Sequence, residues 1–178
     1  MSLVVLGLSH HTAPLPLLET MSLDAAGRAA LADSLTGRDN LSEAVVVSTC
    51  NRTEVYVESQ TFHGAVTDIV DALTDVTGVA SEELREHLYV HYEDRAIAHA
   101  FTVACGLDSM AVGEAQILGQ MRTALREGQR SGHVGPALNS LFQQALRVGK
   151  RAHTETGIDS VSVSLVEAGL ARAERELA

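Results

Sequence analysis

Residues 43–59 read EAVVVSTCNRTEVYVES, and this stretch decides the fold of the chain. Glu43–Ser48 is an apolar run typical of a buried β-strand, and Thr53–Ser59 alternates apolar and polar residues, as strands with two different faces do. Only four residues, Thr49–Arg52, separate the two segments. We therefore predict two strands joined by a tight turn that carries Cys50.

The segments on either side extend this pattern. Leu3–Leu8 is a second apolar run, and Leu88–Tyr92 is a further short strand candidate. Helical spacing occurs from the capping residues Ser22 and Asp24 to about Leu35, before Gly37, and again from Phe62 to about Thr77. The order strand, helix, strand, strand, helix, strand predicts an α+β fold. We expect residues 1–93 to form a ferredoxin-like βαββαβ subdomain, with an antiparallel four-stranded sheet and both helices on one face.

Strand patterns stop at Asp94, and helical spacing takes over. We predict helices over Asp94–Ala104, Gly113–Ser131 and Pro136–Glu155, which form an all-helical subdomain over residues 94–158. Ser160–Ala178 carries a narrow apolar seam that runs to the last residue without a capping signal, so we expect a chain cut from a longer protein.

Composition limits the classes of function. The chain has 178 residues, of which 46% are apolar, enough for one or two small cores. A formal charge of −10 disfavours a surface that binds nucleic acid mainly through phosphates, so any RNA contact should be local. Basic residues gather in Arg122–Arg130 and Arg147–Arg151, and the simpler interpretation of both groups is a solvated helix face. Without a membrane-length apolar run or a charged leader, we expect a cytoplasmic protein with no membrane partner.

The two cysteines are expected to be free thiols with different roles. Cys50 follows a buried strand, and Arg52 nearby would favour a nucleophilic thiolate; the alternative is a small buried residue at a strand end. Cys105 has an apolar helical context and is predicted to be a core residue. His10 and His11 lack a second thiolate at ligand spacing, so we predict no metal site. The glycines form no dinucleotide-binding loop, so the chain offers no site for a nicotinamide cofactor.

Residues 106–120, GLDSMAVGEAQILGQ, place carboxylate, amide and hydroxyl side chains around glycines just before a long helix. Glu114, Gln116 and Gln120 could recognise an ammonium group or an ester. Ordinary helix capping by Asp108 or Ser109 explains the same residues equally well.

Four stretches together resemble the glutamyl-tRNA reductases. They are Gly7–Pro14 (GLSHHTAP), Ser48–Glu54 (STCNRTE), Gly106–Gln120, and Arg151–Thr156 (RAHTET). They occur in the family's order, and the resemblance covers about Leu3 to Val166.

The resemblance implies a reaction. The family reduces the glutamyl ester of tRNA(Glu) with NADPH to glutamate-1-semialdehyde, the first step of five-carbon tetrapyrrole (porphyrin and heme) synthesis, with no metal or flavin. Cys50 would form a thioester, which accepts hydride more readily than a carboxylate does. The NADPH-binding and dimerisation domains would lie beyond this chain, and residues 159–178 would begin the family's spinal helix. Implied partners are glutamyl-tRNA(Glu), a second copy of the full-length protein and the downstream aminomutase.

The resemblance also implies roles for single residues. Arg52 would pair with the substrate α-carboxylate through its forked guanidinium, and His99 would act as a general acid or base or position the substrate. The remaining expected substrate contacts are Thr49, Asn51, Ser109, Glu114, Ala115, Gln116 and Gln120. The chain departs from the family at His11, where a Lys is usual, and at Leu18, where an Arg is common.

Two other interpretations stay open. The chain could be a non-catalytic ferredoxin-like module that regulates a partner through the seam at Val163–Leu177. It could also be an independent cysteine hydrolase, which would need a histidine near Cys50 with its own orienting carboxylate.

Overall fold

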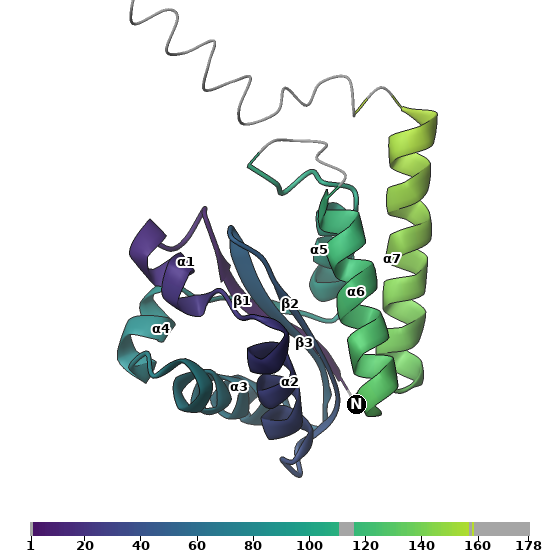
Figure 1. Ribbon diagram of the computed structural model, residues 1–178. Helices are drawn as coiled ribbons and strands as arrows, with labels where there is room; N and C mark the ends of the chain where they lie inside the picture. The colour runs from purple at the N-terminus through teal and green to yellow at the C-terminus, as the bar shows by residue number, and fades with distance from the viewer. Residues whose placement is uncertain (1, 111–115, 157, 159–178) are drawn as a thin grey trace, which may run out of the picture.

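The computed structural model describes residues 2–110, 116–156 and 158. Four strands and seven helices form three layers, with the sheet between two layers of helices (Figure 1). The order is β1 (Ser2–Ser9), α1 (Leu15–Met21), α2 (Ala25–Thr36), β2 (Leu41–Ser48), β3 (Arg52–Ser59), α3 (Phe62–Thr77), α4 (Ser81–His87), β4 (Tyr89–Tyr92), α5 (Asp94–Ala104), α6 (Gln116–Ser131) and α7 (Pro136–Glu155). The predicted spinal helix lies outside the described residues.

The sheet has the strand order β2-β3-β1-β4, and every neighbouring pair is antiparallel. This arrangement confirms the predicted ferredoxin-like βαββαβ pattern. The central pair places Gly7 of β1 opposite Glu54 of β3, and the β2–β3 hairpin closes with Ser48 opposite Thr53. The turn that follows Ser48 is therefore held at one end of the sheet.

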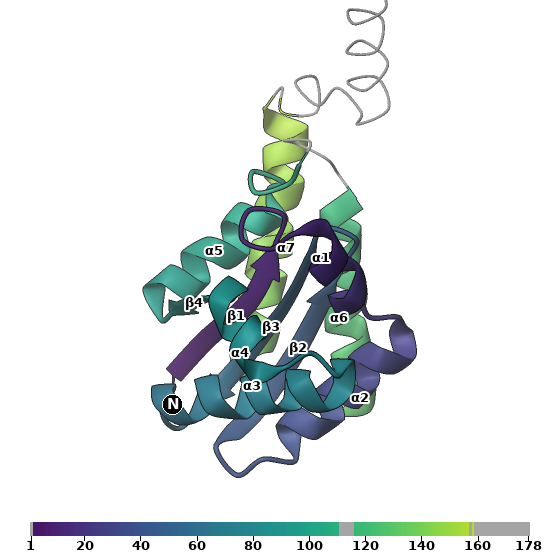
Figure 2. The same ribbon diagram turned by 90° about the vertical axis from the view of Figure 1, so that its left-hand side faces the viewer.

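Helices α1 to α4 cover one face of the sheet (Figure 2). The predicted α2 and α3 lie there together, and Asp24 caps α2 by accepting a hydrogen bond from the Gly27 N–H at 2.8 Å. Helices α1 and α4 were not predicted from the sequence. Each has seven residues, too few for helical periodicity to show, although α1 buries Leu17, Leu18 and Met21 against the sheet.

Helices α5, α6 and α7 cover the opposite face and share a core with the sheet (Figure 1). Tyr56 of β3 and Phe142 of α7 meet edge to face with their ring centroids 5.0 Å apart. The predicted α5 and α7 are confirmed, and so is the predicted helix Gly113–Ser131 from Gln116 onward, while residues 113–115 lie outside the described residues. The core of these helices contains strand residues too, so the boundary at residues 93 and 94 stays a prediction. None of the helices in the described ranges has the length and apolar character needed to cross a bilayer.

Candidate active site

Cys50 lies at the tip of the β2–β3 hairpin. The turn closes through the Thr49 N–H, which donates to the Arg52 carbonyl at 2.8 Å. The Thr49 hydroxyl oxygen also accepts from the N–H groups of Asn51 and Arg52, both at 3.2 Å. These bonds fix the turn from inside and leave the Cys50 side chain exposed. The prediction of free thiols is confirmed, and so is the burial of Cys105.

A pocket of about 190 Å³ opens beside Cys50. Most of the predicted site residues line it, and they come from the hairpin turn, the segment after α5 and the start of α6. The lining residues are Thr49, Cys50, Asn51, Arg52, Ser109, Met110, Gln116, Ile117 and Gln120. Predicted residues Glu114 and Ala115 lie outside the described residues. His99 is not among the residues that line the pocket.

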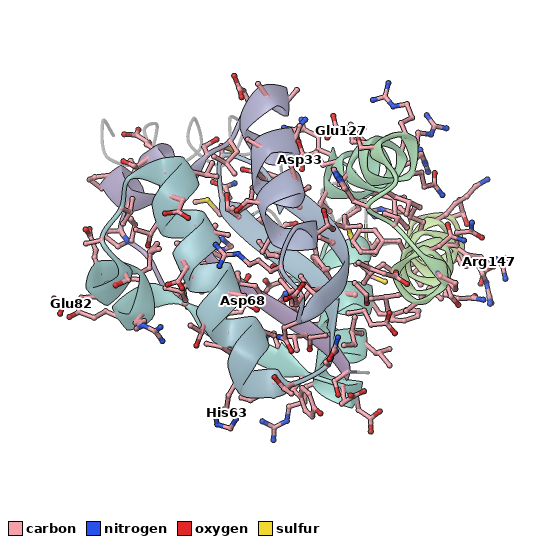
Figure 3. All side chains as sticks on the ribbon, turned by 90° about the horizontal axis from the view of Figure 1, so that it is seen from below. Asp33, His63, Asp68, Glu82, Glu127 and Arg147 are labelled. Atoms are coloured by element: carbon pink, nitrogen blue, oxygen red, sulfur yellow. The ribbon has the colours of Figure 1, made fainter. Side chains whose placement is uncertain are left out.

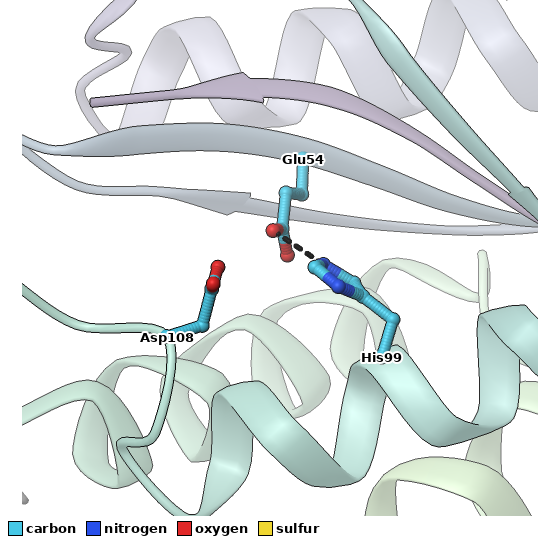
Figure 4. Close-up of side chains that lie close together, drawn as sticks. All are labelled: Glu54, His99 and Asp108. Atoms are coloured by element: carbon cyan, nitrogen blue, oxygen red, sulfur yellow. Dashed lines mark hydrogen bonds and ion pairs between the residues drawn. The ribbon is translucent and has the colours of Figure 1, made fainter. Parts of the chain in front are cut away.

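Arg52, which lines this pocket, is hydrogen-bonded to a buried carboxylate. Glu54 is completely buried on β3, and its two oxygens accept hydrogen bonds from side chains of three elements. The donors are Arg52 (2.7 Å), His99 (2.8 Å) and Tyr89 (2.5 Å) to Oε1, and Tyr56 (2.6 Å) to Oε2. We call these five residues the Glu54 cluster. Figure 4 shows the Glu54 carboxylate pointing from the sheet toward His99 on α5.

The cluster fixes the protonation of its members. Burial alone would raise the pKa of Glu54, but the His99 hydrogen bond and the Arg52 charge outweigh it and lower the pKa to about 2. Burial and the Glu54 carboxylate raise the pKa of both Tyr56 and Tyr89, so the two phenols stay protonated as donors. Because Glu54 is ionised, His99 Nε2 must carry the proton in their hydrogen bond.

Arg52 is held on both sides. Its side chain is only 3% exposed. Nη1 donates to the Glu54 carboxylate. Nη2 donates to the backbone carbonyl of Asp108 and, at 2.9 Å, to the Asp108 carboxylate. Burial opposes the charged form, yet Glu54 and Asp108 keep the pKa of Arg52 above its usual value. From the sequence, Arg52 was expected to favour a thiolate at Cys50 and to pair with the substrate α-carboxylate. In the structure its charge is shared with two carboxylates.

Three potential metal ligands also meet here. One ligand atom each from Glu54, His99 and Asp108 lie within 4.8 Å of one another, and Figure 4 shows the three side chains converging. Arg52 already bonds both carboxylates, so a fixed cation neutralises the two acids of this group. The arrangement suits an arginine better than a metal ion.

Comparison with known proteins places the chain. Residues 6–156 match the family model described as "Glutamyl-tRNAGlu reductase, N-terminal domain". This chain belongs to the glutamyl-tRNA reductase family. The curated glutamyl-tRNA reductase of Frankia casuarinae is 56% identical over 170 residues, which are 96% of this chain and 36% of that protein. That of Thermobifida fusca is 54% identical over 99% of this chain and 37% of that protein.

A solved structure agrees with these relatives. The glutamyl-tRNA reductase from Methanopyrus kandleri has a TM-score of 0.73 and 34% sequence identity over 98% of this chain and 40% of its own. The chain thus spans little more than a third of the length of the relatives that it matches. It corresponds to the N-terminal domain of the family.

The two departures from the family pattern have clear places in the structure. Leu18, where an Arg is common, is 5% exposed and packs in the core beneath α1. His11, where a Lys is usual, lies 3.5 Å from an Asp108 oxygen through Nε2. His11 therefore joins the group around Arg52, whereas Leu18 belongs to the core.

Glu54 and both tyrosines of the Glu54 cluster were not predicted as site residues from the sequence. A signal was present, because Arg52, Glu54 and Tyr56 alternate along β3 and so point to one face of the sheet. That polar stripe resembled a solvent-facing side. Only the packing of α5 to α7 shows that it is buried.

Proposed function

We propose that this chain is the thioester-forming part of a glutamyl-tRNA reductase. The observation that best supports this proposal is an exposed thiol on a fixed hairpin turn. The thiol lies beside a pocket lined by polar residues that include Thr49, Asn51, Ser109, Gln116 and Gln120. Membership of the family supplies the substrate, glutamyl-tRNA(Glu).

The proposed step is an acyl transfer. The Cys50 thiolate attacks the glutamyl ester carbonyl, a C–S bond forms and the ester C–O bond breaks. The departing ribose oxygen takes a proton and leaves as the 3′-terminal hydroxyl of tRNA. We assign the delivery of this proton, or the positioning of the ester, to His99, whose Nε2 is fixed by Glu54.

Arg52 is proposed to bind the substrate α-carboxylate, which requires that Asp108 first leave the guanidinium. Its Nη2 already bonds the Asp108 carboxylate, which is the same chemical group as the proposed ligand. The substrate carboxylate would replace Asp108 on the outer edge of the guanidinium, while Glu54 keeps the inner edge in place. Thr49, Asn51, Ser109, Gln116 and Gln120 are assigned to the rest of the substrate, together with Glu114 and Ala115.

Reduction of the thioester is assigned to NADPH, with no flavin or metal. In the described residues no glycine-rich turn joins a strand to a helix in the way a dinucleotide fold requires, so we derive no hydride step from this chain. The cofactor would bind to parts of the longer relatives that this chain does not span. We likewise assign dimerisation, contact with the aminomutase and a cytoplasmic location to the whole protein.

Acylation of the thiol tests the proposal. The chain is mixed with tRNA charged with labelled glutamate, and the peptide that contains Cys50 is analysed for a glutamyl adduct by mass spectrometry. We expect an adduct or Cys50-dependent release of glutamate, retained in Cys105→Ser and lost in Cys50→Ser. Absence of both products in the unchanged chain would refute the proposal. Release of glutamate that persisted in Cys50→Ser would refute the proposal as well.

A further inference from the structure

The Cys50 pocket continues into a groove along α6. A second hollow of about 400 Å³ shares Gln116 and Gln120 with the pocket and adds Arg28, Ser48, Gly119 and Thr123, among others. A third hollow of about 500 Å³ shares Thr123 with the second and is otherwise lined by Arg126, Gln129 and Arg130. We call the second and third hollows together the α6 groove.

The groove has the length of a short nucleic-acid strand. Gln116 and Arg130 are fourteen positions apart on one helix, which corresponds to about 21 Å at the usual helical rise. A stacked strand carries a phosphate roughly every 3.4 Å along its axis, so about six nucleotides would fit. The floor stays open because Gly119 has no side chain and nothing lies within 4 Å of where a Cβ would be.

The charge of the groove also suits RNA, although the chain as a whole is acidic. Arg122, Arg126 and Arg130 are exposed and recur every four residues, so they form one stripe on α6, and Arg126 and Arg130 of this stripe line the groove. In the described part of the chain, none of these three arginines forms an ion pair. The arginines that do are Arg28, Arg38, Arg52 and Arg151.

The single acid of α6 in the described residues is already neutralised. Glu127 forms a two-pronged ion pair with Arg28 of α2, at 2.9 and 3.0 Å. Figure 3 shows Glu127 between α2 and α6, whereas Arg147 lies on the outer side of α7. The Glu127 carboxylate is thus bound by Arg28 and also acts on the charge of Arg130, so the three arginines of the stripe face one carboxylate that is already paired.

The other basic group of the chain lacks this continuity. Arg147 donates to Gln144, and Arg151 forms an ion pair with Glu155 on the same helix. The hollow beside Arg151 is lined by α7 and Thr156 and shares no residue with the Cys50 pocket. Among the described residues, the basic group on α6 adjoins a path from the thiol, whereas the hollow beside Arg151 does not.

We infer that the α6 groove receives the single-stranded acceptor end of the tRNA, with Arg126 and Arg130 on its phosphates and Gln116 and Gln120 near the terminal nucleotide. This inference rests on the proposed function and adds the direction in which the tRNA leaves Cys50. The strand would run from the hairpin tip along α6, away from the Glu54 cluster.

Binding of uncharged tRNA tests the path without any chemistry at Cys50. Affinity is measured by fluorescence anisotropy over a series of salt concentrations for the unchanged chain, Arg126→Gln/Arg130→Gln and the matched control Arg147→Gln/Lys150→Gln. We expect the α6 variant to bind about tenfold more weakly and its salt slope to fall by about 1.5, since two phosphate contacts are lost. The α7 control should match the unchanged chain.

A second readout separates this inference from the proposed function. Cys50 acylation is followed with glutamyl-tRNA and with a glutamyl ester of a small alcohol. The α6 variant should acylate normally with the small ester and slowly with the tRNA ester. Equal tRNA affinity of the α6 variant and the unchanged chain, or weakening by the α7 control alone, overturns the inference. If the α6 variant bound tRNA more weakly as expected, but neither ester acylated Cys50 in the unchanged chain, the inference would stand and the proposed function would be refuted.

Discussion

Cys50 and Glu54 lie four positions apart at one end of the β2–β3 hairpin, yet their surroundings are opposite. The turn projects Cys50 into solvent, while the next strand carries Glu54 under three helices. A thiol needs exposure to meet a large substrate such as the one proposed, whereas a carboxylate that orients Arg52 and His99 needs burial to hold one geometry. One hairpin supplies both because its tip and its flank face different environments.

Thiol reactivity checks the exposed half of this arrangement. Burial raises the pKa of Cys105 and shields it, so its reactive thiolate is scarce and hard to reach. We expect iodoacetamide to alkylate Cys50 on the order of tenfold faster or more, measured by mass spectrometry of the two peptides over time. Cys105→Ser should leave the Cys50 rate unchanged. Similar rates at the two thiols would count against Cys50 as the nucleophile.

The Glu54 cluster should make stability depend on pH. The pKa of Glu54 falls from 4.5 to about 2 on folding, so the carboxylate stabilises the fold above about pH 4.5, and this contribution disappears as the pH falls toward 2. Urea unfolding at pH 6 and pH 3 should show a loss of about 2 kcal/mol that Glu54→Gln does not share. Glu58→Gln, on the same strand, is the control and should behave like the unchanged chain. An equal loss in Glu54→Gln contradicts this assignment.

At the scale of elements, periodicity predicted whatever was long enough to show it. Helices α3, α5 and α7 have the predicted bounds. Strands β1, β2 and β3 extend one or two residues beyond the predicted bounds, and β4 starts one residue later than predicted. The short α1 and α4 were missed because two turns of helix give no periodic signal. The Glu54 cluster was missed for another reason. Its members come from β3, β4 and α5, and their meeting depends on how helices pack across the sheet, which spacing in sequence does not encode.

Gly7 makes room for the Glu54 cluster. It lies opposite Glu54 in the sheet, and a Cβ there would approach the Thr53 carbonyl oxygen to 2.6 Å and the Glu54 Cγ to 2.8 Å. Gly7→Ala should therefore displace Glu54 and destabilise the fold by about 1–3 kcal/mol. Thermal unfolding measures this cost, and Gly119→Ala, where space is open, is the control. The unfolding free energy of Gly7→Ala should also differ less between pH 3 and pH 6 than that of the unchanged chain. An unchanged difference in unfolding free energy would contradict this account.

A second buried carboxylate holds α7 on the sheet. Glu43 of β2 is 4% exposed, and its two oxygens accept from the backbone N–H groups of Ala137 (3.1 Å) and Leu138 (2.7 Å) at the start of the helix. Glu43→Ala should cost about 2 kcal/mol of unfolding free energy, since two buried donors lose their partner. Urea unfolding checks this value against Glu58→Ala, which should cost less. A cost equal to that of the control would show that Glu43 is not the cap.

On the scale of the whole molecule, one sheet carries two cores. The face toward α1–α4 buries residues such as Leu73, and the face toward α5–α7 buries residues such as Leu138. Alternate residues of β1, β2 and β3 contribute to each core, for example Val55 to the first and Tyr56 to the second. Neither layer of helices can leave without exposing one face of the same strands. The two predicted subdomains should therefore unfold together.

Matched substitutions in the two cores test this coupling. Leu73→Ala and Leu138→Ala each remove a side chain that is no more than 1% exposed, and each should cost about 2–5 kcal/mol. Unfolding is followed by circular dichroism, which reports mainly helices, and by tyrosine fluorescence, to which Tyr56 contributes between sheet and α7. Both variants should shift the two signals together to one new midpoint. If Leu138→Ala instead moved α5–α7 to an earlier, separate transition, the helices after residue 93 would be an independent subdomain.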